Sequence, residues 1–315
     1  MPSLRHIAEN EILLLDVIGF GGFADVHSGL WVSGDREGKG KLAVKVFRQV
    51  KTENDALTLQ TLNRRLHAEI SAWLLVQPHP NILPFIGAYH HDSERLPALV
   101  SPLREAGDVL SYLSRNTFSC RSLALGIVNG LAHLHAHNIV HGDLKPKNVL
   151  IHIDNEGKPT PEISDFGRAK ILDIKGYTGS LHMTRRYAAP EVLNPAHTPD
   201  SPVVEVPRER ANEVLTKASD VWSLGMVLLH VLSGREPYPG LNENQIVLAL
   251  VNGQEPKEED HPKMITCPVR ARAWTILKCC WKLKDGPEAR WSAKECANEL
   301  KIPLEGHTYY NLWAE

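Results

Sequence analysis

Two short stretches in the middle of the chain decide its fold. Residues 141–148 read His-Gly-Asp-Leu-Lys-Pro-Lys-Asn, residues 164–167 read Ser-Asp-Phe-Gly, and the apolar strand candidate 149–151 lies between them. Among other residues, these loops carry two carboxylates, a lysine at 145 and an amide. Such a set suits phosphoryl transfer, in which positioning and charge neutralisation supply most of the catalysis.

The two stretches resemble the catalytic loop and the Asp-Phe-Gly motif of eukaryotic protein kinases. Asp-Phe-Gly alone is a weak signal, but together with the long catalytic-loop match it is a strong one. The resemblance implies that Asp143 is the catalytic base and that Lys145 neutralises the γ-phosphate of ATP during transfer. It also implies that Asn148 and Asp165 bind Mg²⁺, which prefers oxygen ligands.

A glycine-rich segment at 19–22 lies between the strand candidates 12–18 and 24–31. Glycines let backbone N–H groups approach phosphate oxygens. Dinucleotide-binding folds share the pattern, but they need a helix directly after the loop. A hairpin that covers a nucleotide fits better, although Ala24 replaces the third glycine of the kinase pattern and an ordinary hairpin turn stays open as an alternative.

Lys45 lies in the strand candidate 42–47, where alternation places it on the same face as Ala43. A lysine that faces a cleft needs an anionic partner. Glu69 is the natural one, because it falls on the inward apolar stripe of a helix expected over 53–76. The resemblance implies the same pair: Lys45 grips the nucleotide phosphates, and Glu69 holds Lys45.

Two further strands are expected over 83–90 and 96–100. The resemblance then makes Ser101 the gatekeeper and 102–104 the hinge that meets adenine through backbone groups. Most kinases carry a larger gatekeeper, so we expect a roomy pocket behind the adenine site. The ATP-binding residues that the resemblance implies are Ile18, Gly19, Gly21, Val26, Ala43, Lys45, Glu69, Ser101, Leu103, Arg104 and Leu150.

The rest of the chain is predicted to be mainly helical. A helix over 109–115 follows a candidate cap at Gly107-Asp108, and Ser219 is a candidate cap for an apolar helix that ends at Ser233-Gly234. Asp220, at the start of that helix, is expected to anchor the catalytic-loop backbone. A long amphipathic helix has its inward face at Leu123, Ile127, Leu131 and Leu134.

Three histidines in this amphipathic region invite a metal interpretation: His133, His135 and His137. Their spacing spreads them around a helix, and no acidic or cysteine residue is near them in the sequence. We therefore expect histidines at the surface or at the helix end.

Kinases commonly carry arginine before the catalytic aspartate, and this chain has Gly142 there. That arginine usually pairs with a phosphorylated residue, so its absence implies the non-RD type, whose activity does not depend on that switch. Lys145, together with Thr184 seven residues before Glu191, favours Ser/Thr substrates. In kinases this glutamate forms a buried ion pair with a late arginine, here Arg290.

Composition narrows the class of protein. The chain has 315 residues, 43% of them hydrophobic, a net charge of -2 and five irregularly spaced cysteines. Scattered basic residues give no indication of a nucleic-acid partner. The cysteines indicate a reducing compartment, and the longest apolar run, 221–232, is too short to span a membrane. A cytoplasmic protein is expected.

We therefore expect an α+β, two-lobed protein-kinase fold. The small lobe, an antiparallel β-sheet plus one helix, would occupy 1–103, the large, mainly helical lobe 104–303, and a tail 304–315. Cys280-Trp281 and the residues up to Trp291 resemble the tyrosine-kinase-like (TKL) group. The loop 194–217, rich in proline and charge, could dock a partner.

The expected activity is transfer of the ATP γ-phosphate to Ser/Thr hydroxyls of protein substrates in signal transduction. A nucleotide-binding pseudokinase scaffold and a dual-specificity or tyrosine kinase stay open as alternatives. A small-molecule kinase is disfavoured, because the Ala-Pro-Glu segment shapes a peptide-binding surface. Against a pseudokinase, the chain retains all of Lys45, Glu69, Asp143, Lys145, Asn148 and Asp165.

Overall fold

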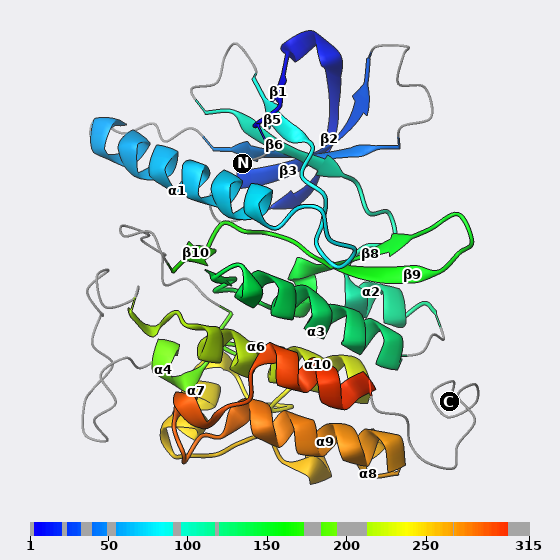
Figure 1. Ribbon diagram of the computed structural model, residues 1–315, viewed down its shortest axis with the longest axis vertical. Helices are drawn as coiled ribbons and strands as arrows, with labels where there is room; N and C mark the ends of the chain where they lie inside the picture. Colours follow the sequence, from blue (N-terminus) through cyan, green and yellow to red (C-terminus); the bar gives the residue numbers. More distant parts are fainter. Residues whose placement is uncertain are drawn as a thin grey trace.

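A six-stranded sheet forms the first part of the molecule (Figure 1). The structure, a computed structural model, describes residues 3–20, 24–32, 40–48, 55–90, 96–116, 120–172, 184–193, 213–266 and 268–301. The strand order is β1-β5-β6-β4-β3-β2, antiparallel except for the parallel pair β1 and β5. The strands are β1 His6–Ile7, β2 Ile12–Phe20, β3 Ala24–Trp31, β4 Leu42–Phe47, β5 Gly87–Tyr89 and β6 Ala98–Pro102.

Strand register gathers predicted site residues on one face of this sheet. Lys45 of β4 lies opposite Val26 of β3, and Ala43 lies opposite Ser101 of β6. Directly opposed residues of antiparallel strands point to the same side. Val44, between them in the chain, points to the other side and is fully buried in the core of the sheet. The predicted alternation of β4 is confirmed.

Helix α1 (Asp55–Leu75) runs beside the sheet (Figure 1). Its inward stripe includes Leu66, Ile70 and Trp73, all buried, and Glu69 is buried on the same side. The expected strand 83–90 is shorter than predicted: only Gly87–Tyr89 joins the sheet. The reason is that the N–H of Leu83 donates to the carbonyl of Ile163 (2.9 Å), so the start of this segment pairs with a distant strand instead.

The second part of the molecule is mainly helical, with two small two-stranded antiparallel sheets between it and the six-stranded sheet (Figure 1). Its helices are α2 Val109–Leu113, α3 Cys120–Ala136, α4 Pro190–Leu193, α6 Lys217–Ser233, α7 Glu243–Val251, α8 Pro262–Thr266, α9 Pro268–Trp281 and α10 Ala293–Lys301. The short strands are β7 Ile139–Val140, β8 Val149–Ile153, β9 Pro159–Ile163 and β10 Lys170–Ile171; the 3₁₀ turns are η1 Glu9–Glu11, η3 Pro146–Asn148, η4 Glu258–Asp260 and η5 Pro287–Ala289.

Helix α6 is the buried centre of this part, because nearly all of its own side chains, most of them apolar, are buried. Its cap corrects the sequence prediction. Thr216 is the N-cap and accepts the N–H of Ser219, whose own hydroxyl completes a capping box. The helix ends at Gly234, as predicted, with φ at 70° in the left-handed region.

One large hydrophobic core joins α1 to the helices, and its inward face on α3 is the predicted stripe of Leu123, Ile127, Leu131 and Leu134. The expected α+β, two-lobed architecture, with an antiparallel-rich sheet and a helical region, is confirmed. Within the described ranges, no helix combines the length and the apolar character that crossing a membrane requires.

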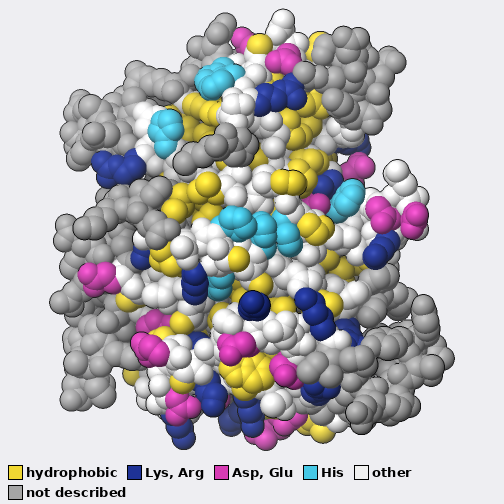
Figure 2. All heavy atoms as spheres, viewed as in Figure 1, with side chains coloured by type: hydrophobic (Ala, Val, Ile, Leu, Met, Phe, Trp, Pro, Cys, Tyr) yellow, Lys and Arg dark blue, Asp and Glu magenta, His cyan; other side chains and the backbone are white. Residues whose placement is uncertain are grey.

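Figure 2 shows histidine side chains gathered midway along one face, at the level where α1 and α3 meet in Figure 1. The ring of His133 stacks on His79 at a centroid distance of 4.1 Å and lies 4.4 Å from His137. Among the described residues, no three or more histidine, cysteine or acidic side chains are grouped to hold a metal ion.

Candidate active site

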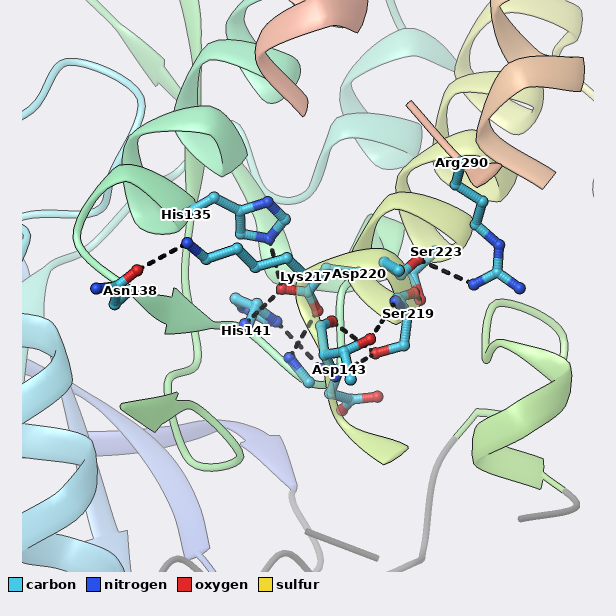
Figure 3. A network of polar contacts seen from close by, with 12 residues as sticks. His135, Asn138, His141, Asp143, Lys217, Ser219, Asp220, Ser223 and Arg290 are labelled. Carbon is cyan, nitrogen blue, oxygen red and sulfur yellow. Dashed lines mark hydrogen bonds and ion pairs between the residues drawn. The ribbon is translucent and has the colours of Figure 1, made fainter. Parts of the chain in front are cut away.

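The backbone of the loop 141–148 is clamped from α6. Asp220 accepts the N–H of His141 (2.7 Å) and the N–H of Gly142 (2.9 Å), one on each carboxylate oxygen. Figure 3 shows Asp220 between this loop and the end of α3. The predicted anchoring role of Asp220 is confirmed, and because the carboxylate is buried, the two charge-assisted bonds hold the loop firmly.

His135 belongs to the same network. It lies in the last turn of α3, in line with the helix-end expectation, but it has an acidic partner that the sequence did not indicate. It is buried, and its Nε2 lies 3.0 Å from Asp220 (Figure 3). Asp220 is 85 residues away in the sequence, so no local pattern announces the contact. The available signal was the position of His135 four residues after Leu131, which places it beside the inward stripe of α3.

Gly142 adopts a backbone conformation that disfavours other residues. Its φ is 76°, and a Cβ there would lie 2.8 Å from the carbonyl oxygen of Arg168. This turn brings the N–H of Asp143 to Nδ1 of His141 (3.2 Å). The glycine therefore lets the loop turn tightly just before the predicted catalytic base.

The three predicted catalytic residues lie together. Nζ of Lys145 is 2.7 Å from a carboxylate oxygen of Asp143, and the side-chain amide of Asn148 donates to the backbone carbonyl of Asp143 (2.8 Å). Both Asp143 and Lys145 keep partial exposure to solvent. The carboxylate is therefore held in place and still accessible to a substrate hydroxyl.

A second cluster joins the sheet, α1 and the Asp-Phe-Gly turn. Nζ of Lys45 contacts Glu69 at 2.7 Å and Asp165 at 2.9 Å. The predicted Lys45–Glu69 pair is thus present, and Asp165 is an additional partner. Glu69 is only 3% exposed, whereas Asp165 is 46% exposed and can reach a ligand in solution.

Charges within this cluster shift one another's protonation. The Lys45 ammonium holds the pKa of Asp165 well below its usual range. Burial by itself would lower the pKa of Lys45, but the carboxylates of Asp165 and Glu69 outweigh it and raise this pKa. Lys45 and Asp165 are therefore charged at neutral pH, as phosphate and metal binding require.

Aromatic packing supports the Asp-Phe-Gly turn from below. Phe166 is fully buried and stacks on Trp73 of α1 at a centroid distance of 5.6 Å. The ring of His141 lies 5.8 Å from Phe166, and its Nε2 contacts the carbonyl of Ser164 (3.0 Å). His141 and Phe166 therefore support the turn by packing.

The predicted nucleotide-binding residues lie on the sheet face described above and on nearby segments. Gly19 pairs with Val26 across β2 and β3, and Ser101 is buried beside Ala43. Ile18 is exposed at the end of β2. The N–H of Leu103 donates to the carbonyl of Lys41 (2.8 Å). The side chain of Arg104 pairs with Glu162. Leu150 lies partly exposed on β8. Gly21 falls outside the described residues, and contact of these residues with ATP stays a prediction.

The donor set at the predicted metal site fits Mg²⁺. Asp165 offers an exposed carboxylate. Asn148 donates an amide N–H to the Asp143 carbonyl, and within the described residues its side-chain oxygen remains available as an acceptor. Both are hard oxygen ligands, and Mg²⁺ is typically bound by one or two carboxylates together with substrate phosphates.

The segment 184–191 is tied to the helical part. Glu191 forms a bidentate pair with Arg290, at 2.5 and 2.9 Å, which confirms the predicted partner. Within the described residues, the Thr184 hydroxyl makes no hydrogen bond to Asp143 or Lys145. Residues 194–212 of the predicted docking loop and the tail 304–315 lie outside the described ranges.

Comparison with known proteins adds a family match. Residues 13–300 match the family model described as the protein kinase domain. A probable LIM domain-containing serine/threonine-protein kinase of Dictyostelium discoideum is 27% identical over 96% of this chain, which spans 41% of that protein.

Two further relatives come from other organisms. A probable serine/threonine-protein kinase, PknB, of Bifidobacterium longum is 27% identical over 97% of this chain and 41% of its own length. The epidermal growth factor receptor of Apis mellifera is 28% identical over 95% of this chain and 21% of its own length. This chain therefore spans less than half the length of these curated relatives.

Proposed function

The chain belongs to the protein kinase domain family, and on that premise we propose that it transfers the γ-phosphate of ATP to serine and threonine hydroxyls of proteins. The observation that carries the proposal is the Asp143–Lys145 contact of 2.7 Å on a loop clamped by Asp220. The names of the Dictyostelium and Bifidobacterium relatives support serine and threonine as acceptors.

Asp143 is the proposed catalytic base. A substrate hydroxyl bound at its carboxylate attacks the γ-phosphorus, the bond to the β–γ bridging oxygen breaks, and ADP leaves with the bond's electron pair. The hydroxyl proton passes to Asp143. Lys145, already 2.7 Å from Asp143, is placed to neutralise the transferring phosphoryl group.

Asp165 and Asn148 are the residues we propose to hold Mg²⁺, which when bound neutralises phosphate charge and orients the β- and γ-phosphates. Lys45 would bind the α- and β-phosphates, and the buried Glu69 carboxylate keeps its ammonium pointed into the site. Gly19, Gly21 and the other predicted ATP-binding residues remain part of the proposal.

We propose that the chain is of the non-RD type and nearest the TKL group. The glycine at 142, with φ in the left-handed region, provides no cation for a phosphorylated partner. Treatment of the purified protein with a phosphatase should therefore change its rate of phosphoryl transfer little. A large drop in that rate would contradict the non-RD assignment.

The finer organisation also remains a proposal. We place the lobe boundary at 103/104, and we keep the cytoplasmic location on the basis of the odd number and irregular spacing of the cysteines. Docking of a partner through 194–217 rests on sequence alone.

The test is transfer of labelled γ-phosphate from Mg-ATP to a mixed Ser, Thr and Tyr peptide library. Wild-type protein should label Ser/Thr peptides, and Asp143→Asn should lower the rate by about a hundredfold or more. Asp154→Asn, at an exposed turn between β8 and β9, is the matched control and should retain activity. Labelling of tyrosine alone would overturn the acceptor assignment. No labelling, with ATP still raising Tm, would favour a nucleotide-binding scaffold.

A further inference from the structure

Arg104 and Glu162 form an ion pair that the catalytic mechanism does not use. Nε and Nη2 of Arg104 donate to the two oxygens of Glu162, at 2.7 and 2.9 Å, and the two side chains are only 12% and 5% exposed. Taking both charges out of water is costly, and the pair persists only because its geometry is bidentate. Such a pair fixes the two backbones that carry it.

The pair joins the connector 103–108, between β6 and α2, to the hairpin of β8 and β9. Glu162 lies on β9 directly opposite Leu150 of β8. At its other end, the connector is bonded to the same hairpin, because the N–H of Ile151 donates to the carbonyl of Gly107 (2.9 Å). The hairpin of β8 and β9 therefore contacts the connector near both of its ends, at Arg104 and at Gly107.

The same strand leads to the metal-binding turn. Asp165 follows Glu162 by three residues, and between them Ile163 donates its N–H to the carbonyl of Asn81 (2.9 Å). One strand thus relates the connector to Asp165 and, through β8, to Leu150, one of the predicted ATP-binding residues.

Backbone bonding singles out one donor on the connector. Pro102 has no N–H, and the N–H of Leu103 is used by Lys41. The carbonyl of Arg104 accepts the N–H of Gly107 (2.9 Å). The next backbone N–H along the connector is that of Arg104, and among the described residues no backbone carbonyl accepts it. The side chain of the same residue is bound by Glu162.

We propose that the Arg104–Glu162 pair is a positioning pair for nucleotide binding: it orients the connector backbone against the adenine base. The inference rests on the proposed function. The loop that carries Asp143 and Lys145 is held separately, by Asp220 at His141 and Gly142 and by Asn148 at the carbonyl of Asp143. Loss of the Arg104–Glu162 pair should therefore weaken nucleotide binding without slowing the chemical step. In kinetic terms, KM for ATP should rise while kcat at saturating ATP stays the same.

The experiment measures Kd for a non-hydrolysable ATP analogue by calorimetry, and KM and kcat for ATP, in four variants. Arg104→Lys cannot form a bidentate pair, and Arg104→Met removes the charge; each should raise Kd about tenfold. The double variant Arg104→Met, Glu162→Gln leaves no buried unpaired charge, so it should fold even if Arg104→Met alone does not. It should lose the same nucleotide affinity as the single variants. The exchange Arg104→Glu with Glu162→Arg rebuilds the pair and should recover most of the affinity.

The matched control is the Lys41–Glu105 pair, which begins on the same connector but is exposed, at 54% and 67%. Glu105→Gln should change Kd less than about twofold. An unchanged Kd in the Arg104 variants would overturn the inference, as would a loss confined to kcat. A wild-type protein that binds no nucleotide would overturn the proposed function and the inference with it.

Discussion

Histidine side chains of α3 have different roles according to what packs against them. His135 contacts the buried Asp220, whereas His133 stacks on His79, which comes from the segment after α1. Nδ1 of His79 accepts the N–H of Asn81 (3.1 Å), so this ring must be neutral at that nitrogen to keep the bond. At the scale of the residue, protonation of His79 is therefore opposed by its surroundings.

This opposition predicts a pH dependence of stability. Burial, followed by the neighbouring His133 and His137, lowers the pKa of His79 to about 4. In the unfolded chain a histidine has a pKa of about 6.5, so the unfolded state binds the proton first as pH falls. The stabilisation is complete above about pH 6.5 and is lost between that value and about pH 4.

The free energy of unfolding, measured with urea from pH 8 to pH 5, should fall with a slope no steeper than about 1.4 kcal/mol per pH unit for this one proton. His79→Gln should make the slope shallower. At pH 8 the free energies of unfolding of wild type and His79→Gln should differ only by the contacts that the substitution removes. That difference is the baseline for comparing the two slopes. Equal slopes for both proteins would contradict the assignment.

At the scale of elements, Arg290 joins several pieces of the helical part. Its guanidinium pairs with Glu191 of α4, donates to the carbonyls of Trp281 and Ala218, and lies over the ring of Trp222 at 5.0 Å. The side chains of Arg290 and Glu191 are 2% and 15% exposed. One side chain thus fixes the start of α4 against α6 and the end of α9.

Removing one partner should be strongly destabilising, because it leaves a buried charge without compensation. We expect Glu191→Ala to lower the free energy of unfolding by roughly 3–5 kcal/mol. The control is Glu299→Ala, which breaks the more exposed Arg272–Glu299 pair and should cost less than about 1 kcal/mol. Urea unfolding measures the free energy of unfolding of both variants. Similar decreases in the two variants would show that burial of the Glu191–Arg290 pair does not account for the destabilisation.

At the scale of the whole molecule, the site is assembled from parts that the chain separates widely. Lys45 comes from the sheet, Glu69 from α1 and Asp165 from the turn after β9, yet one ammonium contacts both carboxylates. The core that buries α1 continues into the helices, so the position of Glu69 depends on packing across the molecule. Activity should therefore respond to this pair, with Glu69 acting through Lys45.

Glu69→Gln removes a buried charged partner of Lys45. Hydrogen bonds to charged groups contribute about 1.5–3 kcal/mol, so kcat/KM for ATP should fall about ten- to hundredfold. Glu259→Gln, a change of an exposed acid on η4, is the control and should leave kcat/KM unchanged. Circular dichroism checks that both variants are folded. Unaltered kcat/KM in Glu69→Gln would contradict a role for this pair.

The sequence by itself determined the elements and the chemical inventory. Alternation predicted β4 and the face of Lys45, and helical periodicity predicted the buried stripes of α1 and α3, because backbone geometry repeats every two or 3.6 residues. The motifs at 141–148 and 164–167 supplied the predicted catalytic and metal-binding residues, and the structure brings Asp143, Lys145 and Asn148 together.

Tertiary structure alone decided the contacts between residues distant in the chain. His135 finds Asp220, Arg104 finds Glu162, and the segment after α1 pairs with β9 instead of extending β5. Local sequence encodes the periodicity and capping of each element, but a buried polar group takes whichever partner the packing of other elements brings within reach. For that reason the predicted catalytic residues came from the sequence, and the network that positions them came from the fold.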